Sequence, residues 1–178
     1  MTEVVRVEGF RSSFVPGLFR IKRESWVTTL PCKGLISQEK AEELAHLYFS
    51  RDQAKTISRR LDSFKEYVKG KQFFPLILEK TLIGCAVLKE MDQAGSIELY
   101  SFDIRKKYRR NGHGTQLMKH VLSYIQKKGY QSVHVWFFSH NVAAQKFYEM
   151  LGFTHPEEDT WRMSDSVLID LIHMRKDL

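Results

Sequence analysis

Short runs of alternating or continuous hydrophobic residues in the middle of the chain predict a group of strands. Gln72–Leu78, Leu82–Lys89 and Ser96–Ile104 are such runs, and residues typical of turns separate them. Consecutive short strands joined by tight turns form an antiparallel meander. A short first strand is also predicted at Val4–Phe10, near the start of the chain.

Between the first strand and the meander, the hydrophobic residues recur at helical spacing. This spacing predicts a helix over Phe14–Leu30, and Pro31 ends it. Ser37 is placed to begin a second helix that continues through Tyr48. Helical character with polar faces then extends from Asp52 to about Val68.

After the meander, helical and strand patterns alternate. Thr115–Lys128 has one continuous apolar stripe and is the clearest helix of the chain. Ser132–Phe138 has the composition of a buried strand, and Asn141 is placed to cap a short helix that Gly152 closes. A last strand is predicted over Val167–Arg175.

The order of these elements predicts the fold class. A strand–helix–strand crossover makes Ser96–Ile104 and Ser132–Phe138 parallel neighbours, whereas the meander stays antiparallel. We therefore expect an α/β protein with a mixed, mostly antiparallel sheet and helices on both faces. At 178 residues the chain is expected to form one domain, 1–178, with a core at 72–175 and a helical segment at 1–70.

Composition excludes several classes of protein. The hydrophobic content of 43% is ordinary for a globular domain, and no stretch is long and apolar enough to span a membrane. The N-terminus lacks the pattern of a secretion signal, so a cytoplasmic location is expected. Cys32 and Cys85 are isolated and are expected to be reduced core residues; with no paired His or Cys spacing, no metal site is expected.

Positive charge is concentrated in one part of the chain. The net charge is +7, yet no acidic residue lies between Asp103 and Glu149, and residues 109–114 read Arg-Arg-Asn-Gly-His-Gly. Glycines allow backbone N–H groups to approach a ligand, and a helix N-terminus favours anions. These features predict a phosphate-bearing ligand held by backbone amides. A nucleic-acid module would add a recognised motif to its basic patch, and none is present.

Two blocks of residues resemble the GNAT superfamily of N-acetyltransferases. Arg109, Gly112 and Gly114 match its acyl-CoA loop, [Gln/Arg]-x-x-Gly-x-[Gly/Ala]. The second block, Asn-x-x-Ala-x-x-Phe-Tyr followed by Gly-Phe, is complete, with Asn141, Ala144, Phe147, Tyr148, Gly152 and Phe153. The resemblance implies the GNAT fold, in which the two parallel strands splay apart, and acetyl-CoA as co-substrate.

The resemblance also implies which residues bind the cofactor. The loop amides would hold the pyrophosphate, the strand end at 102–104 would pair with the pantetheine arm, and Asn141 would both cap its helix and bond the pantetheine. The expected cofactor-binding residues are Phe102, Asp103, Ile104, Arg109, Arg110, Asn111, Gly112, His113, Gly114, Thr115, Asn141, Ala144 and Tyr148. Lys106 and Lys107 are expected to mix solvated surface with contacts to the 3′-phosphate. Asp103 departs from the family pattern; it would either face the substrate cleft or be a solvated acid.

Two residues are candidates for catalysis. In the family, the tyrosine that matches Tyr148 points at the CoA sulfur and can protonate the departing thiolate; the alternative is a core aromatic. Glu98 resembles the general base of several relatives, although a surface or substrate-binding acid fits equally well. Strand alternation predicts that Glu98, Tyr100 and Phe102 share one face. His134 is read as a packed or edge histidine rather than a base.

The expected reaction is direct transfer of an acetyl group to a primary amine of a small molecule, polyamine-like or aminoglycoside-like. A protein lysine or N-terminal acetyltransferase and a non-catalytic CoA-binding regulatory domain remain alternatives. The acidic run at 157–159 is interpreted as an exposed turn in preference to a border of the acceptor site. No nucleic-acid or membrane partner is expected, and dimers common among relatives allow a homodimer.

Overall fold

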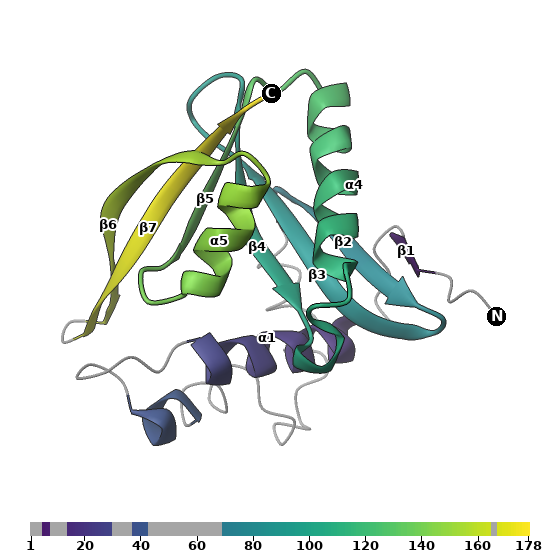
Figure 1. Ribbon diagram of the computed structural model, residues 1–178, viewed down its shortest axis with the longest axis vertical. Coiled ribbons are helices and arrows are strands. Elements are labelled where there is room, and N and C mark those ends of the chain that lie inside the picture. Colours follow the sequence, from purple (N-terminus) through teal and green to yellow (C-terminus); the bar gives the residue numbers. More distant parts are fainter. Residues whose placement is uncertain (1–4, 8–13, 30–36, 43–68, 165–166) are drawn as a thin grey trace.

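A single seven-stranded sheet forms the centre of the computed structural model, which describes residues 5–7, 14–29, 37–42, 69–164 and 167–178 (Figure 1). The strand order is β1-β2-β3-β4-β5-β7-β6. The strands are β1 (Val5–Val7), β2 (Lys71–Leu78), β3 (Thr81–Glu90), β4 (Ser96–Ile104), β5 (Ser132–Phe138), β6 (Thr154–Ser164) and β7 (Val167–Asp177). The helices are α1 (Val15–Thr29), α4 (His113–Lys127), α5 (Val142–Met150) and the 3-10 turn η3 (Lys106–Tyr108).

The parallel strand pair lies in the middle of the sheet. Every neighbouring pair is antiparallel except β4 and β5, as the crossover predicts. These two strands pair only over Ser96–Ser132, Ile97–Val133 and Glu98–His134, and they are not paired beyond that point. The Ser96 and Ser132 hydroxyls form a hydrogen bond of 2.9 Å at the end where the two strands are paired. The two strands therefore splay apart, and the predicted mixed sheet is confirmed.

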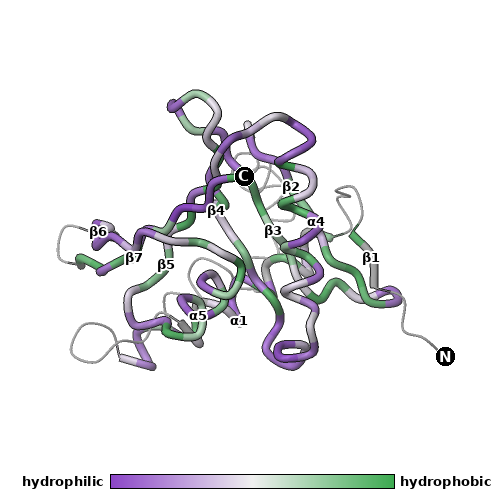
Figure 2. Tube along the Cα trace, turned by 45° about the horizontal axis from the view of Figure 1, so that its top comes forward, coloured by the Kyte–Doolittle hydropathy of each residue, from purple (hydrophilic) through white to green (hydrophobic). Residues whose placement is uncertain are grey.

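Helices cover both faces of the sheet, and each face has its own core. On one face, the apolar stripe of α4 packs with α5 against the central strands. On the other face, Leu18 and Ile21 of α1 pack with Ile77, Leu82 and Cys85. In Figure 2, hydrophobic residues are concentrated in the central strands, whereas residues along β6 are mostly hydrophilic. The burial of Cys85 confirms its interpretation as a reduced core residue.

The edge strand β6 is absent from the prediction. Residues 157–159 were interpreted as a turn, but they lie within β6 and pair with β7 through His173, Ile172 and Leu171. The interpretation as a turn is wrong because residues 154–162 of this strand are all exposed, so no alternation of hydrophobic and polar residues marks them in the sequence. The hydrogen bonds of β7 hold it instead.

A β-bulge in β4 changes which side chains face the two cores. Val87 pairs with Ser101 and Leu88 with Leu99, so Tyr100 is an extra residue without a partner on β3. Leu99 and Phe102 consequently both pack in the core beside α4 and α5. The expectation that Glu98 and Phe102 share a face is therefore wrong, since simple alternation is lost at an inserted residue.

The segment before the meander is described in part. The helix α1 lies within the predicted span 14–30, and residues 38–42 are helical, with the Ser37 hydroxyl accepting from the Lys40 amide at 3.1 Å. The helical prediction for 52–68 and the interpretation of Cys32 fall outside the described residues. None of the described helices is long and apolar enough to cross a membrane.

Candidate active site

A cavity of about 560 Å³ opens where β4 and β5 diverge. This volume is within the usual range for sites that bind small molecules. Its walls come from α1, from both diverging strands, from the start of α5 and from β6. The lining residues that the following argument uses are Lys22, Glu98, Ser101, Asp103, Trp136, Asn141, Tyr148, Asp159 and Trp161.

The loop between β4 and α4 has the backbone shape that the glycine pattern predicts. Arg110 and Gly112 both adopt positive φ, 66° and 78°, and Gly112 stands at the N-cap of α4. The first-turn N–H groups of a helix have no partner within the helix, and at this end of α4 no side chain caps them. The helix begins at His113, two residues before the predicted start, which places Thr115 inside its first turn. Asn111 is exposed beside them.

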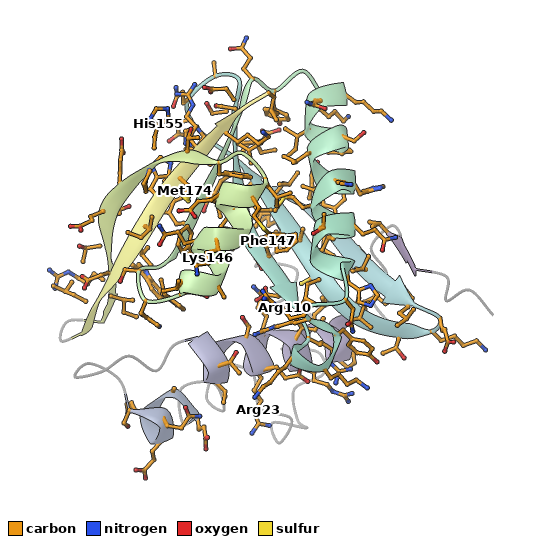
Figure 3. The ribbon with its side chains drawn as sticks, viewed as in Figure 1. Arg23, Arg110, Lys146, Phe147, His155 and Met174 are labelled. Atoms are coloured by element: carbon orange, nitrogen blue, oxygen red, sulfur yellow. The ribbon has the colours of Figure 1, made fainter. Side chains whose placement is uncertain are left out.

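Basic side chains surround this helix end. Figure 3 shows Arg110 on the loop where α4 begins. Arg109 donates from Nε to the carbonyl oxygen of Ile104 at 2.8 Å, which ties the loop to the end of β4. Arg105 is paired with Glu24 of α1 at 3.1 Å. An uncapped helix N-terminus next to several cations fits the pyrophosphate and 3′-phosphate of coenzyme A.

The end of β4 presents different side chains to the two faces of the sheet. Phe102 stacks on Phe147 of α5, with ring centroids 5.5 Å apart. In Figure 3, Phe147 projects from α5 toward α4, and a Cβ built on Gly114 would lie 3.6 Å from its ring. Ile104 packs in the same core. Phe102 and Ile104 are thus anchored on one side, while Asp103 faces the other.

Asp103 is a buried acid that carries an ion pair. Its carboxylate accepts from the Lys22 ammonium at 2.7 Å and from the Ser101 hydroxyl at 2.7 Å, and Lys22 also contacts Ser101. Burial alone would raise the pKa of Asp103, but Lys22, with Ser25 and Ser101, holds that pKa below its ordinary value. The alternative of a solvated acid beside the basic loop is wrong, because α1 covers this position, and Asp103 lines the cavity.

Tyr148 belongs both to the core and to the cavity wall. Its side chain is only 5% exposed, and its ring lies between 5.3 and 5.6 Å from the rings of Phe137, Phe147 and Phe153. Burial raises the pKa of Tyr148 above its ordinary value, and the negative charge of Asp103 adds to this. The phenol therefore stays protonated at neutral pH, where it can donate a proton but not accept one.

Asn141 and Ala144 stand at the start of α5. The Asn141 carbonyl oxygen accepts from the Ala144 amide at 3.1 Å, so the predicted helix cap is confirmed. Both residues also line the cavity.

Glu98 lies at the point where the parallel strands begin to separate. Its side chain is 20% exposed, and its carboxylate is 3.8 Å from the Lys89 ammonium. Burial raises the pKa of Glu98, although Lys89 and Lys71 oppose this effect. A carboxylate with a raised pKa on a cavity wall is suited to accept a proton near neutral pH.

His134 is buried and packed, as predicted, and it is not among the residues that line this cavity. Its Nδ1 lies 3.0 Å from Nε2 of His173, and its Nε2 lies 3.1 Å from the Ser132 hydroxyl. Burial, followed by the nearby His173 and Arg175, lowers the pKa of His134. Among the described residues, no group of three or more His, Cys, Asp or Glu side chains is arranged to hold a metal ion.

Several cavity residues were missed at the level of sequence. Lys22 reaches the site from α1, and Trp136, Asp159 and Trp161 reach it from β5 and β6. No local signal could have identified Lys22, because its role depends on a partner distant in the chain. For Asp159 the sequence offered a weak signal, because one of the two interpretations of the acidic run at 157–159 placed it at the border of the acceptor site.

The fold and the motifs agree with a family match. A model of the acetyltransferase (GNAT) family matches residues 39–153, more than half of the chain. The chain belongs to the acetyltransferase (GNAT) family. The predicted superfamily and fold are therefore confirmed, and the family's enzyme class is the predicted one, that of acetyltransferases.

Solved GNAT structures share this fold over nearly the whole chain. The PaiA N-acetyltransferase from Thermoplasma acidophilum, in complex with coenzyme A, superposes with a TM-score of 0.69 at 20% identity, covering 98% of this chain and 99% of that one. An N-acetyltransferase from Staphylococcus aureus Mu50 superposes with a TM-score of 0.71 at 17% identity, covering 99% of both chains. At these identities the similarity shows the GNAT fold.

Curated relatives match a shorter part of the chain. N-acetylaspartate synthetase from Rattus norvegicus is 27% identical over 86 residues, which are 48% of this chain and 29% of the relative. The enzyme of the same name from Xenopus tropicalis is 28% identical over 86 residues, covering 48% of this chain and 32% of the relative. The match thus spans less than a third of the length of these relatives.

Proposed function

We propose that this GNAT protein is an N-acetyltransferase that moves the acetyl group of acetyl-CoA to a primary amine of a small molecule by direct attack. The observation that carries the proposal is the cavity between the splayed strands. It has a protonated phenol, Tyr148, and a carboxylate of raised pKa, Glu98, among its lining residues. One group suits proton donation and the other suits proton acceptance.

The chain offers complementary groups along the length of coenzyme A. The uncapped N-terminus of α4 and the basic side chains around it suit the phosphates. The end of β4 at Phe102, Asp103 and Ile104 would follow along the pantetheine arm; Phe102 and Asp103 line the cavity, as do Asn141 and Ala144. The complex of the Thermoplasma acidophilum enzyme supports this assignment, because that protein has the same fold and its structure contains coenzyme A.

Two proton transfers would accompany the reaction. Acetyl-CoA supplies an activated thioester, whose C–S bond breaks as the new C–N bond forms. Glu98 takes the proton that the amine loses, directly or through water, and Tyr148 gives a proton to the departing sulfur. Burial raises the pKa of Tyr148 above that of an ordinary phenol, so its proton stays in place until negative charge develops on the sulfur, and the same desolvation raises the pKa of the thiol that forms beside it.

The acceptor is proposed to be a small cationic amine, polyamine-like or aminoglycoside-like. Apart from tyrosines, the ionisable side chains that line the cavity, among the residues that the structure describes, are Glu98, Asp103, Asp159 and Lys22. Lys22 is already paired with Asp103, so an amine meets more negative than positive charge on entering. Cytoplasmic location and a homodimeric state stay predictions.

The proposal can be tested by two measurements on the wild-type protein. Calorimetry should detect binding of coenzyme A, and release of free thiol from acetyl-CoA should depend on an added amine from a panel that includes a lysine peptide and an N-terminal peptide. The Tyr148→Phe variant should still bind coenzyme A, but with kcat lowered by about a hundredfold.

Each result separates one alternative from the rest. Binding without turnover on any amine would favour a regulatory domain that senses the coenzyme, and turnover confined to peptides would favour a protein acetyltransferase. Absence of heat on titration with coenzyme A would refute the whole proposal. A Tyr148→Phe variant with unchanged kcat across the pH range would refute the acid role alone.

A further inference from the structure

Trp136, Asp159 and Trp161 form one wall of the cavity, on the β5–β7–β6 side of the splay. We infer that this wall is a subsite for a second ammonium group of the acceptor, so that the acceptor is a diamine or polyamine. The inference rests on the proposed function and adds the substrate class and the residues that select it.

Asp159 is a carboxylate with capacity to bind a cation. Its Oδ2 accepts from the Trp136 indole N–H at 2.9 Å, and its Oδ1 accepts from the Thr160 amide at 2.7 Å. These two bonds orient the group but use only part of its acceptor capacity, because a carboxylate can accept about four hydrogen bonds. Both donors are neutral, so the negative charge is not compensated by them.

The other two carboxylates of the cavity already have cationic partners. Asp103 is paired with Lys22 at 2.7 Å, and Glu98 is 3.8 Å from Lys89. By contrast, within the ranges that the structure describes, no basic side chain forms an ion pair with Asp159. Among the described acids that line the cavity, Asp159 is therefore the one whose charge is available to a ligand.

The two tryptophans add aromatic faces suited to the same ligand. Trp136 is fixed by stacking on His173, with ring centroids 4.4 Å apart, and by its bond to Asp159. Trp161 stands two positions after Asp159 on β6, and its side chain is 39% exposed. An ammonium group near a carboxylate and an indole face gains from both charge pairing and the ring quadrupole.

Because this wall lies across the splay from Glu98, it favours acceptors that carry a second ammonium group. Asp159 comes from β6, whereas Glu98 comes from β4 on the other side of the splay (Figure 1). An amine whose reacting nitrogen lies near Glu98 can place a second ammonium group at Asp159 only if a chain joins the two nitrogens. An amino acid such as aspartate would instead bring carboxylates to this wall beside Asp159, and Lys22, the basic side chain among the described lining residues, is already paired with Asp103.

Matched acceptors and matched variants test the inference. The probes are 1,4-diaminobutane, 1-aminobutane and L-aspartate, and the measured quantity is the ratio of kcat/KM for the diamine to kcat/KM for the monoamine. We expect Asp159→Asn to lower this ratio about tenfold and Trp161→Leu to lower it about threefold. Glu158→Gln is the control, because it removes the same charge from the neighbouring position of β6 without touching the lining of the cavity.

The failure of this inference is distinguishable from the failure of the proposed function. A wild-type protein that acetylates amines but shows the same ratio in Asp159→Asn, or an equal fall in Glu158→Gln, would overturn the subsite and leave the proposed function standing. Faster acetylation of L-aspartate than of the diamine would also overturn it. A wild-type protein that acetylates no amine would overturn both.

Discussion

Removing the Lys22 ammonium should destabilise the protein more than any change of a surface charge. In Lys22→Met the side chain keeps its length, but Asp103 loses the cation 2.7 Å from its carboxylate. At an effective dielectric constant of about 20, that distance corresponds to about 6 kcal/mol of attraction. Desolvation of both groups offsets part of it, and breaking a buried pair typically costs about 3–5 kcal/mol. Because Lys22 is 19% exposed, we expect a loss near the lower end, about 3 kcal/mol.

The loss should depend on pH in a direction set by Asp103. In the wild type its folded pKa is lowered, so the pair stabilises the fold above the unfolded pKa of about 3.9 and is lost as pH falls through the folded pKa. Without Lys22, burial raises the folded pKa above 3.9, and protonation then relieves the unpaired charge as pH falls. The destabilisation measured by urea unfolding should therefore be larger at pH 7 than at pH 4.5.

Two further variants make the reasoning refutable. Lys22→Met combined with Asp103→Asn should recover much of the lost stability, because no buried charge remains to be compensated. Lys89→Met is the control, since the Lys89–Glu98 contact is longer, at 3.8 Å, and half exposed on the lysine side; we expect about 0.5 kcal/mol or less. Equal losses in the two lysine variants, or a double variant less stable than Lys22→Met, would contradict the account.

Three other predictions concern the loop, the base and the buried thiol. Gly112→Ala should lower the free energy of unfolding in urea by about 1–2 kcal/mol because φ is 78° there, although the new Cβ meets nothing within 4 Å. Gly114→Ala is the control, because Gly114 has no positive φ, and its loss should be clearly smaller. Similar losses in the two variants would contradict a backbone origin. In the wild type, the rate should decline on the acidic side with a midpoint above the ordinary glutamate pKa, because the pKa of Glu98 is raised. Glu98→Gln should lower kcat and remove this acidic limb. An unchanged pH–rate profile would rule out Glu98 as the base. Burial raises the pKa of Cys85 to about 12, so its thiol should be unreactive in the folded protein. With mass spectrometry as the readout, iodoacetamide at pH 8 should label the Cys85 peptide only after denaturation. Labelling of the folded protein would contradict this prediction.

Local patterns in the sequence were sufficient to predict the elements that we propose bind the coenzyme. The stripe of α4 repeats every three or four residues, and Gly112 is required by a local backbone angle, so neither depends on distant parts of the chain. The parallel pairing of β4 and β5 follows from a crossover with one allowed hand. The two family motifs are likewise local in the sequence, and they led to the correct superfamily.

The acceptor side was decided by tertiary structure. The bulge at Tyr100 turns Phe102 away from the face of Glu98, and alternation within one strand cannot reveal an inserted residue. Lys22 and Asp103 lie far apart in the chain, and only packing of α1 on the sheet turned a polar helix position and an unusual acid into a buried pair. Asp159 depends on β6, a strand that exists because β7 supplies its hydrogen bonds. Interactions that repeat along a segment are encoded locally, whereas a charge or an edge strand takes its role from whatever the fold places beside it.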